Sequence, residues 1–180
     1  GAQVHVLDAS LDRLRQLSSL LPANAIPLMS APDTVRRLAA TADLVIGSVL
    51  TPGARTPRLI TRNMLRQMKK GAVIVDVAID QGGCIESSRP TTLDDPVFVE
   101  QGIIHYCVTN MPGAVPRTST LALTNATLPY ALALADKGWQ KACRDDEALL
   151  AGLNIAEDLI THPAVAAAMN TEYRDPSTLL

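Results

Sequence analysis

The sequence predicts an α/β fold with a doubly wound parallel sheet, followed by a mainly helical carboxyl-terminal segment. From residue 3 to residue 108, short aliphatic and β-branched runs alternate with segments of helical periodicity. This alternation is typical of βαβ units, whose strands lie parallel between layers of helices. Three of the runs end at polar or turn-forming residues, as expected where an open sheet meets a ligand. Beyond residue 111 the alternation stops and a long apolar helix is predicted instead.

The amino-terminal part predicts two strands and two helices. Residues 3–8 alternate between polar and apolar side chains and then stop at Asp8, as a strand would. A helix follows over about residues 10–21. Residues 26–30 form a weaker strand because they contain a proline, which an edge position tolerates. A second helix is predicted over residues 32–41, with a proline in its first turn.

Asp8 allows two interpretations. An acidic residue at the end of the second strand of a dinucleotide-binding unit hydrogen-bonds the adenosine ribose. In such a unit a glycine-rich turn lies about 20 residues upstream. Only seven residues precede Asp8, and no Gly-x-Gly occurs in the chain. Either Asp8 caps the next helix, or the chain begins in the middle of a Rossmann-type sheet that lacks its first strand and glycine-rich turn.

The middle of the chain predicts three buried strands, over residues 43–50, 72–79 and 103–108. A short helix over about residues 61–68 separates the first two. The second strand is followed at once by Asp80 and then by two glycines, which let backbone approach a ligand closely. A plain turn begun by Asp80 is an equally good interpretation of this spacing.

Three predicted strand ends point to one edge of the sheet. They are the Val49–Leu50 pair, Asp80 and the Thr109–Met111 run; a loop at Thr51–Gly53 is predicted beside the first. Because ligands of open α/β sheets bind outside the carboxyl ends of the strands, this convergence predicts a ligand crevice.

Beyond residue 111 a helix is predicted over residues 117–137, ended by Gly138. Apolar side chains cover so much of its circumference that we expect it to be buried between layers or subunits. Pro129 should kink this helix or follow a break in it. Weaker helices are predicted near residues 147–150 and 163–169.

The composition argues against several classes of protein. A net charge of −2 gives no support for binding nucleic acid or an anionic membrane. No apolar run approaches the ~20 residues of a membrane-spanning helix, and the start of the chain lacks a signal-peptide pattern. The three cysteines have no metal-type spacing, and the three histidines are isolated, two of them in predicted strands. We therefore expect reduced thiols, no metal site, hydrogen-bonded rather than catalytic strand histidines, and a cytoplasmic protein.

Two longer strings resemble a known family. Residues 80–92 (DQGGCIESSRPTT) resemble the signature of the alanine dehydrogenases, which share a family with nicotinamide nucleotide transhydrogenases. Residues 106–120 and 123–127 resemble the same family. The resemblance covers residue 4 to about residue 153 and implies the carboxyl-terminal half of a larger enzyme. Residues 1–111 would then be part of an NAD-binding domain, and residues 112–180 an inter-domain helix and the end of the substrate domain.

The resemblance implies an activity: the reversible, NAD-dependent oxidative deamination of L-alanine to pyruvate and ammonia. Asp80 matches the family's catalytic aspartate, while the partnering histidine and the substrate-binding arginine and lysine belong to the half that this chain does not contain. The resemblance also implies a cytoplasmic homo-oligomer, a homohexamer in the family. We expect the 180-residue chain to be inactive by itself.

The resemblance further implies which residues bind the cofactor. Asp8 and Arg13 would lie near the adenosine ribose, and Ser30 near the adenine. The nicotinamide half would be lined by Val49, Leu50, Val77, Ala78, Ile79, Asp80, Arg89, Val108, Thr109, Asn110 and Met111. The apolar members fit a place in the core at least as well, and Arg13 and Arg89 fit solvated surface arginines. Asn110 is the more specific signal, because an amide at a strand end has little use in a core.

Three classes of function remain open. The first is an NAD-dependent alanine dehydrogenase. The second is the nucleotide-binding part of a transhydrogenase, which works with a membrane partner. The third is a truncated remnant that keeps only the fold or an oligomer interface. The close match of residues 80–92 to the alanine dehydrogenase signature, with no membrane helix after it, favours the first class.

Overall fold

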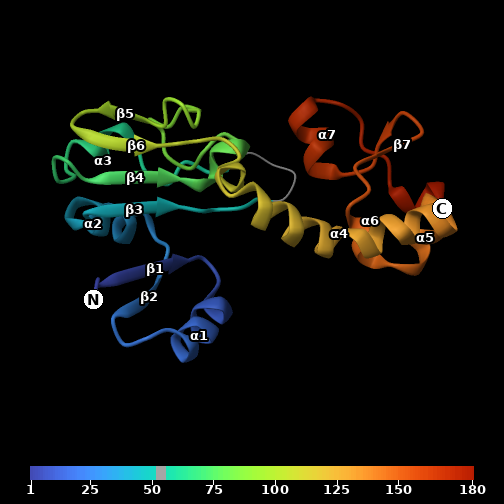
Figure 1. Cartoon of the computed structure of the whole chain (residues 1–180), viewed down its shortest axis with the longest axis horizontal. Coiled ribbons are helices and arrows are strands. Elements are labelled where there is room, and N and C mark those ends of the chain that lie inside the picture. Colours follow the sequence, from blue (N-terminus) through green and yellow to red (C-terminus); the bar gives the residue numbers. More distant parts are fainter. Residues whose placement is uncertain (52–55) are drawn as a thin grey trace. The chain divides into compact units, whose positions relative to one another are not determined.

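The computed structural model describes residues 1–51 and 56–180 (Figure 1). Pro52 and Gly53 of the predicted loop therefore lie outside the described residues. The contacts divide the chain into one unit of Gly1–Val49 and Thr56–Thr109 and a second unit of Leu50–Arg55 and Asn110–Leu180. The proposed roles of residues 1–111 and 112–180 as parts of a cofactor domain and a substrate domain stay predictions.

The first unit begins with a two-stranded parallel sheet. Strands β1 (Val4–Asp8) and β2 (Ala25–Met29) pair along their whole length, with helix α1 (Leu11–Leu20) between them in the chain. The hydroxyl of Ser10 accepts a hydrogen bond from an amide in the first turn of α1 and caps it. Leu14 is the buried residue of this helix. The predicted strand–helix–strand order is thus confirmed, including the proline in β2.

The larger sheet of the first unit has four strands in the order β3-β4-β6-β5. Its three parallel members are β3 (Leu44–Gly47), β4 (Val73–Asp76) and β6 (Ile103–Tyr106). This arrangement confirms the predicted α/β class. The helices that accompany the sheet are α2 (Pro32–Thr41) and α3 (Arg62–Leu65).

The core of this unit lies against the four-stranded sheet. Its completely buried members include Leu65 of α3, Ile74 of β4 and Ile103 of β6, and Ala39 of α2 joins the same cluster. Burying each such aliphatic side chain contributes roughly 1.5–3 kcal/mol. The sheet therefore holds the strand ends in fixed positions.

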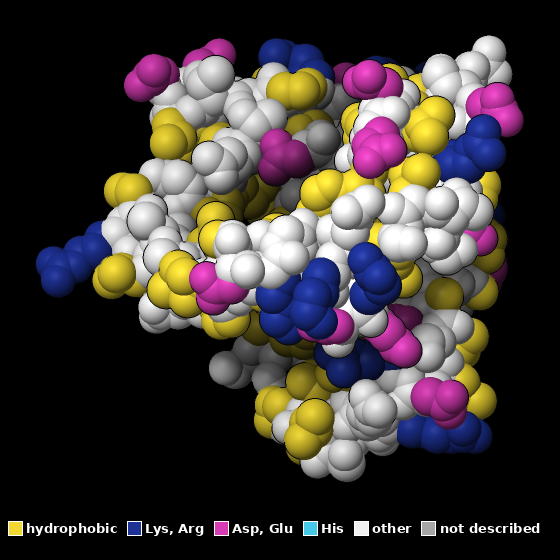
Figure 2. Space-filling view, turned by 90° about the vertical axis from the view of Figure 1, so that its right-hand side faces the viewer, with side chains coloured by type: hydrophobic (Ala, Val, Ile, Leu, Met, Phe, Trp, Pro, Cys, Tyr) yellow, Lys and Arg dark blue, Asp and Glu magenta, His cyan; other side chains and the backbone are white. Residues whose placement is uncertain are grey.

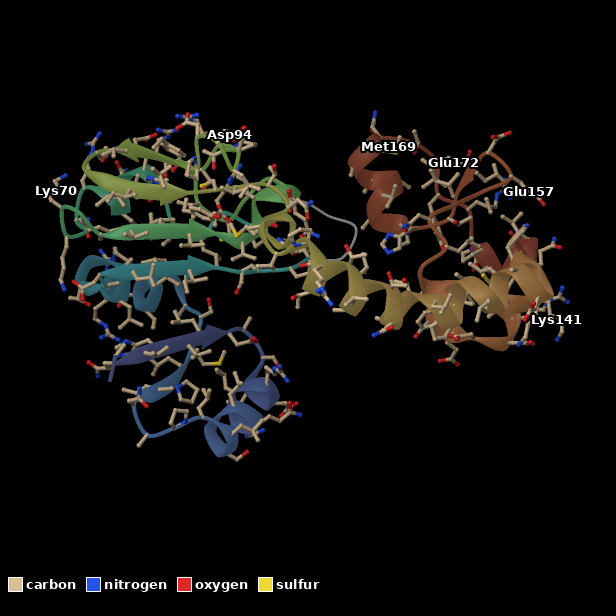
Figure 3. The ribbon with its side chains drawn as sticks, in the orientation of Figure 1. Lys70, Asp94, Lys141, Glu157, Met169 and Glu172 are labelled. Carbon is tan, nitrogen blue, oxygen red and sulfur yellow. The ribbon has the colours of Figure 1, made fainter. Side chains whose placement is uncertain are left out.

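Strand β5 (Val97–Glu100) was not predicted, and it runs antiparallel to β6. The two strands are joined by Gln101 and Gly102, whose φ angles are 54° and 79°. Two successive residues at positive φ form the turn that suits a tight hairpin. Lys70 (Figure 3) donates from Nζ to the Gln101 carbonyl at 2.5 Å and holds this turn.

The predicted strands at residues 43–50, 72–79 and 103–108 are each too long. The largest error concerns Val77–Gln81, which forms a 3₁₀ turn, η1, instead of the end of a strand. The physical reason is Asp76, which is fully buried at the end of β4. A buried carboxylate needs hydrogen-bond donors, and Asp76 finds them in the chain that follows, which must turn to supply them.

The second unit is mainly helical. It consists of η2 (Met111–Ala114), α4 (Pro116–Lys137), α5 (Trp139–Asp145), α6 (Glu147–Ala151), the hairpin of β7 (Ile155–Ala156) and β8 (Leu159–Ile160), α7 (Pro163–Met169) and η3 (Pro176–Leu179). Pro129 lies within α4 and Gly138 ends it, as predicted. Lys141 of α5 (Figure 3) forms an ion pair with Asp145 at 3.1 Å.

Helix α4 does not have the predicted burial in this chain, since none of its side chains is buried. Its exposed apolar residues are Leu121, Leu123, Leu128, Tyr130, Leu132 and Leu134. None of the helices in the described part of the chain is both long and apolar enough to cross a membrane.

We expect the purified 180-residue chain to self-associate. Strands β1 and β3 each have one edge to which no described strand is paired, and unpaired edges recruit other chains. Hydrophobic side chains also reach the surface (Figure 2): Ile46 of β3 is 59% exposed and Leu123 of α4 is 66% exposed. Light scattering after size-exclusion chromatography measures the effect, and a Leu123→Gln, Leu132→Gln variant should associate less. A monodisperse monomer of the unaltered chain would contradict this expectation.

Candidate functional site

Two of the predicted adenosine-binding residues, Asp8 and Ser30, meet at the carboxyl ends of β1 and β2. One carboxylate oxygen of Asp8 accepts a hydrogen bond from the Ser10 amide at 2.7 Å. The Ser30 amide donates to the Asp8 carbonyl at 2.9 Å, which places these two predicted residues side by side. Arg13 lies in the first turn of α1 and its guanidinium contacts Gln16 at 3.3 Å. Ser10 is the N-cap of α1, and Asp8 binds the amide of this cap residue instead of capping the helix itself. The Asp8 carboxylate retains capacity to accept further bonds.

A second group of predicted residues follows the ends of β3, β4 and β6, which are neighbours in the sheet. Because these strands are parallel, their carboxyl ends lie at one edge. The members of this group are Val49, Val77, Ala78, Ile79, Asp80, Val108 and Thr109. The structure thus brings most of the predicted nicotinamide-side residues to a common edge of the first unit.

Asp80 is presented outward by η1. Ala78 and Ile79 are buried beneath the turn, whereas Asp80 is exposed and Val77 is 46% exposed. The side chains of Ala78, Ile79 and Val108 are packed in the interior, so only their backbone atoms could reach a ligand. For these three residues the core interpretation of the side chain is the one the structure supports.

The loop after Asp80 is held by the Asp76 carboxylate, which sequence reasoning missed. The Cys84 amide donates to Oδ2 of Asp76 at 3.0 Å, and the Ile85 amide donates to the same atom at 3.3 Å. The Cys84 thiol lies 3.6 Å from Oδ1. An acid inside the otherwise apolar run 72–79 was the available signal, since a buried carboxylate must find donors nearby.

Two glycines permit this arrangement. Gly83 has a φ of 77°, and a Cβ there would lie 2.6 Å from Oδ2 of Asp76. Gly47, at the end of β3, leaves the space that the Cys84 sulfur occupies. The loop that follows β4 can therefore lie close to the ends of β3 and β4 only because positions 47 and 83 have no side chain.

Arg58 holds the same loop from its carbonyl side. Its guanidinium donates to the carbonyl oxygens of Gly83 at 3.0 Å and Ile85 at 2.7 Å. The Leu59 amide donates to the Cys84 carbonyl, also at 2.7 Å. A carboxylate thus binds the amides of the loop, and a guanidinium and the Leu59 backbone amide bind its carbonyls, which fixes the loop against the sheet.

The three cysteines are free and buried. Burial, with a further contribution from the charge of Asp76, raises the pKa of the Cys84 thiol to about 12. Burial also raises the pKa of Cys107 and of Cys143. All three are therefore protonated at neutral pH, and Cys84 serves as a donor to Asp76 rather than as a nucleophile. Within the described residues there is no group of three or more side chains that could hold a metal ion.

Arg89 is exposed but not unconstrained. Its guanidinium carbon lies 4.2 Å from the centre of the Phe98 ring, which stacks on His105 with the ring centres 4.7 Å apart. The Ile103 carbonyl, 3.0 Å from Nδ1 of His105, can only accept, so Nδ1 carries the proton. Nε2 then accepts from the Ser87 hydroxyl at 2.7 Å. Burial lowers the pKa of His105, which agrees with the predicted hydrogen-bonded strand histidine.

Leu50, Asn110 and Met111 belong to the second unit. Leu50 is 71% exposed. Asn110 has a left-handed backbone with φ of 51° and precedes η2, which begins at Met111. Its carbonyl accepts from the Gly113 amide at 2.8 Å. A left-handed asparagine before a Pro-Gly turn has a local structural purpose, in addition to the binding role that the resemblance implies.

Comparison with known proteins gives a consistent result. Residues 1–163 match the family described as "Alanine dehydrogenase/PNT, C-terminal domain". The chain is 53% identical over 180 residues to the alanine dehydrogenase of Halomonas elongata, covering all of this chain and 48% of that protein. It is 50% identical to alanine dehydrogenase 2 of Staphylococcus aureus over 97% of this chain and 47% of that protein.

Solved structures show the same relation. A structure of L-alanine dehydrogenase has a TM-score of 0.79 and 45% sequence identity, and the match covers 94% of this chain and 47% of that one. The transhydrogenase from Sinorhizobium meliloti is more distant, with a TM-score of 0.66, 26% identity, and coverage of 91% of this chain and 43% of that one. The chain spans about half the length of the relatives it matches.

We predict that Gly83→Ala destabilises the protein more than Gly82→Ala does. Both glycines have positive φ, but a Cβ at Gly82 would meet nothing within 4 Å, whereas one at Gly83 would displace the Asp76 carboxylate. The left-handed backbone costs about 1–2 kcal/mol in either variant, and losing a buried hydrogen bond adds about 1–3 kcal/mol at Gly83 alone. Urea unfolding followed by circular dichroism compares the two. Equal losses would show that the close approach to Asp76 is unimportant.

Proposed function

Because this chain belongs to the alanine dehydrogenase/PNT family, we propose that it forms the carboxyl-terminal half of an NAD-dependent L-alanine dehydrogenase. The proposed reaction converts L-alanine, NAD⁺ and water to pyruvate, ammonium and NADH with release of a proton, and it is reversible. The observation that carries the proposal is the 53% identity to an alanine dehydrogenase over the whole chain. The 26% identity to the transhydrogenase structure gives the alternative less support.

We propose that the first unit binds the dinucleotide. The Asp8 carboxylate, with Ser30 beside it, fits the hydroxyls of an adenosine ribose at the ends of β1 and β2. The ends of β3, β4 and β6 offer backbone groups and Asp80 for the nicotinamide half. When bound, NAD⁺ supplies the hydride acceptor for the Cα hydrogen of alanine.

We assign Asp80 the exchange of protons during hydrolysis of the imine that hydride loss produces. Addition of water to an imine and expulsion of ammonia require a group that both takes up and releases protons. Asp80 is exposed on a turn whose Ala78 and Ile79 side chains are anchored in the core. The arginine and lysine that would hold the substrate, and the partnering histidine, come from the remaining half of the complete enzyme.

We also propose that the complete enzyme is a cytoplasmic homo-oligomer. The exposed apolar side chains of α4, such as Leu121, Leu128 and Leu132, suit an interface. Three free cysteines suit a reducing compartment. The homohexamer of the family is the oligomer we expect.

We expect the complete enzyme to prefer NAD to NADP. The Asp8 carboxylate should accept bonds from the ribose hydroxyls and repel a 2′-phosphate. In an Asp8→Ser variant the ratio of kcat/KM for NAD to kcat/KM for NADP should fall about tenfold or more, as about 1.4 kcal/mol of differential binding is lost. Asp12→Asn is the control, since Asp12 is exposed and paired with Arg15. An equal or higher kcat/KM with NADP in the unaltered enzyme would refute this specificity.

The Asp80→Asn variant of the complete enzyme tests the function itself. It should fold and bind NAD while kcat for alanine-dependent NADH formation falls about 10²-fold or more, the usual contribution of a general acid–base group. The Asp94→Asn variant is the control: Asp94 (Figure 3) is an exposed carboxylate of the same unit. The 180-residue chain alone is the blank, for which we expect no activity. If the Asp80→Asn variant kept near-normal turnover, Asp80 would have no role in proton exchange and would serve only to form the turn.

A further inference from the structure

We propose that Asp76 is a positioning residue for Asp80: its buried carboxylate closes the loop that presents Asp80 to the reacting atoms. The proposal rests on the proposed function, since it concerns the same reaction. Asp76 is placed to act through the chain rather than on the substrate, because it is completely buried.

The Asp76 carboxylate joins the start of one short segment to its end. Asp76 ends β4, opposite Gly47 of β3. Its oxygens accept the amides of Cys84 and Ile85 at 3.0 and 3.3 Å, with the Cys84 thiol at 3.6 Å. Residues 76–85 therefore form a closed loop, and Asp80 lies near its middle. Taking a carboxylate out of water is costly unless donors compensate it, so these bonds fix the loop strongly.

Two backbone hydrogen bonds within the loop connect the segment held by Asp76 to the turn that contains Asp80. The Gly83 amide donates to the Ala78 carbonyl and the Gly82 amide to the Ile79 carbonyl, both at 2.9 Å. The residues next to Asp80 in η1 are thus tied to the two glycines that precede Cys84. A shift of the Cys84 amide away from Asp76 would pass through these bonds to the backbone of Asp80.

The loop has a second attachment that does not involve Asp76. Arg58 binds the carbonyls of Gly83 and Ile85, and the Thr56 amide donates to the Gln81 carbonyl at 3.3 Å. An altered Asp76 should therefore displace the loop rather than unfold the unit. Since misplacing a reacting group by about 1 Å can cost about 10²-fold in rate, even a small displacement should be measurable.

The first test is a double-mutant cycle in the complete enzyme. Asn at position 76 keeps the volume of Asp and one acceptor oxygen, but it removes the negative charge that strengthens the bonds to Cys84 and Ile85. Its NH₂ group donates and cannot replace the second acceptor, Oδ1, which the Cys84 amide and thiol also approach. Asp76→Asn should lower kcat about 10- to 100-fold with little change in KM for NAD. In an Asp80→Asn background the same change should lower kcat much less, because the group it positions is already absent. An unaltered kcat would overturn the proposal. So would an equal loss in both backgrounds, because a change that only damages the structure would lower kcat by the same factor whether or not Asp80 is present.

The second test does not depend on turnover. Hydrogen exchange followed by mass spectrometry or NMR should show faster exchange of the Cys84 and Ile85 amides in Asp76→Asn, with the β4 amides still protected. Asp94→Asn is the matched control and should change neither exchange nor kcat. If Asp80→Asn keeps normal turnover, the proposed function of Asp80 fails. Unchanged exchange at Cys84 and Ile85 would instead show that Asp76 does not hold the loop.

Arg58→Met provides a variant in case Asp76→Asn does not fold. Arg58 is exposed, and methionine keeps part of its aliphatic stem while removing the bonds to the two carbonyls. The same loop should be loosened, and kcat should fall with the same dependence on Asp80. A kcat loss that persists in the Asp80→Asn background would contradict the positioning role.

Discussion

The arrangement of the first unit depends on one buried carboxylate. Asp76 stands where β4 leaves the sheet, and it accepts hydrogen bonds from the loop that returns past β3. Because these donors are fixed in number and direction, the chain between them cannot continue as a strand. The 3₁₀ turn, the positive φ of Gly83 and the absence of a side chain at Gly47 all follow from this requirement.

Much of the fold could be predicted from local patterns. Helix ends were given by residues with strong intrinsic preferences, such as Pro32 at the start of α2 and Gly138 after α4. The parallel strands were visible as β-branched runs. The features that were not predicted depend on contacts between residues distant in sequence. Arg58, for example, binds carbonyls 25 and 27 residues away. No window of the sequence contains such a pair.

Strand β5 was not predicted for a different reason. Gln101-Gly102 is a less familiar hairpin turn than Asn-Gly, so the run before it was not recognised as a strand. The candidate site shows a similar division. Asp8 ends β1 and Ser30 follows β2, so the two residues that the resemblance assigns to the adenosine lie beside each other, while their binding roles stay predictions. Asp76 was missed, because an acid in an apolar run indicates a buried carboxylate but does not show which amides further along the chain bind it.

The larger sheet has one antiparallel and two parallel strand pairs, and this mixture has a consequence for the order of folding. The β5–β6 hairpin joins residues that are close in sequence, and hairpins form within about 1–10 μs. The β4–β6 pair must wait for a long crossover to close. We therefore expect β6 to form early, within this hairpin, and β4 to dock on it afterwards. The loop that carries the candidate catalytic aspartate is closed by bonds to Asp76 at the end of β4 and from Arg58 and Leu59. We therefore expect this loop to take its shape with the docking of β4 and the segment before it, and not with the early hairpin.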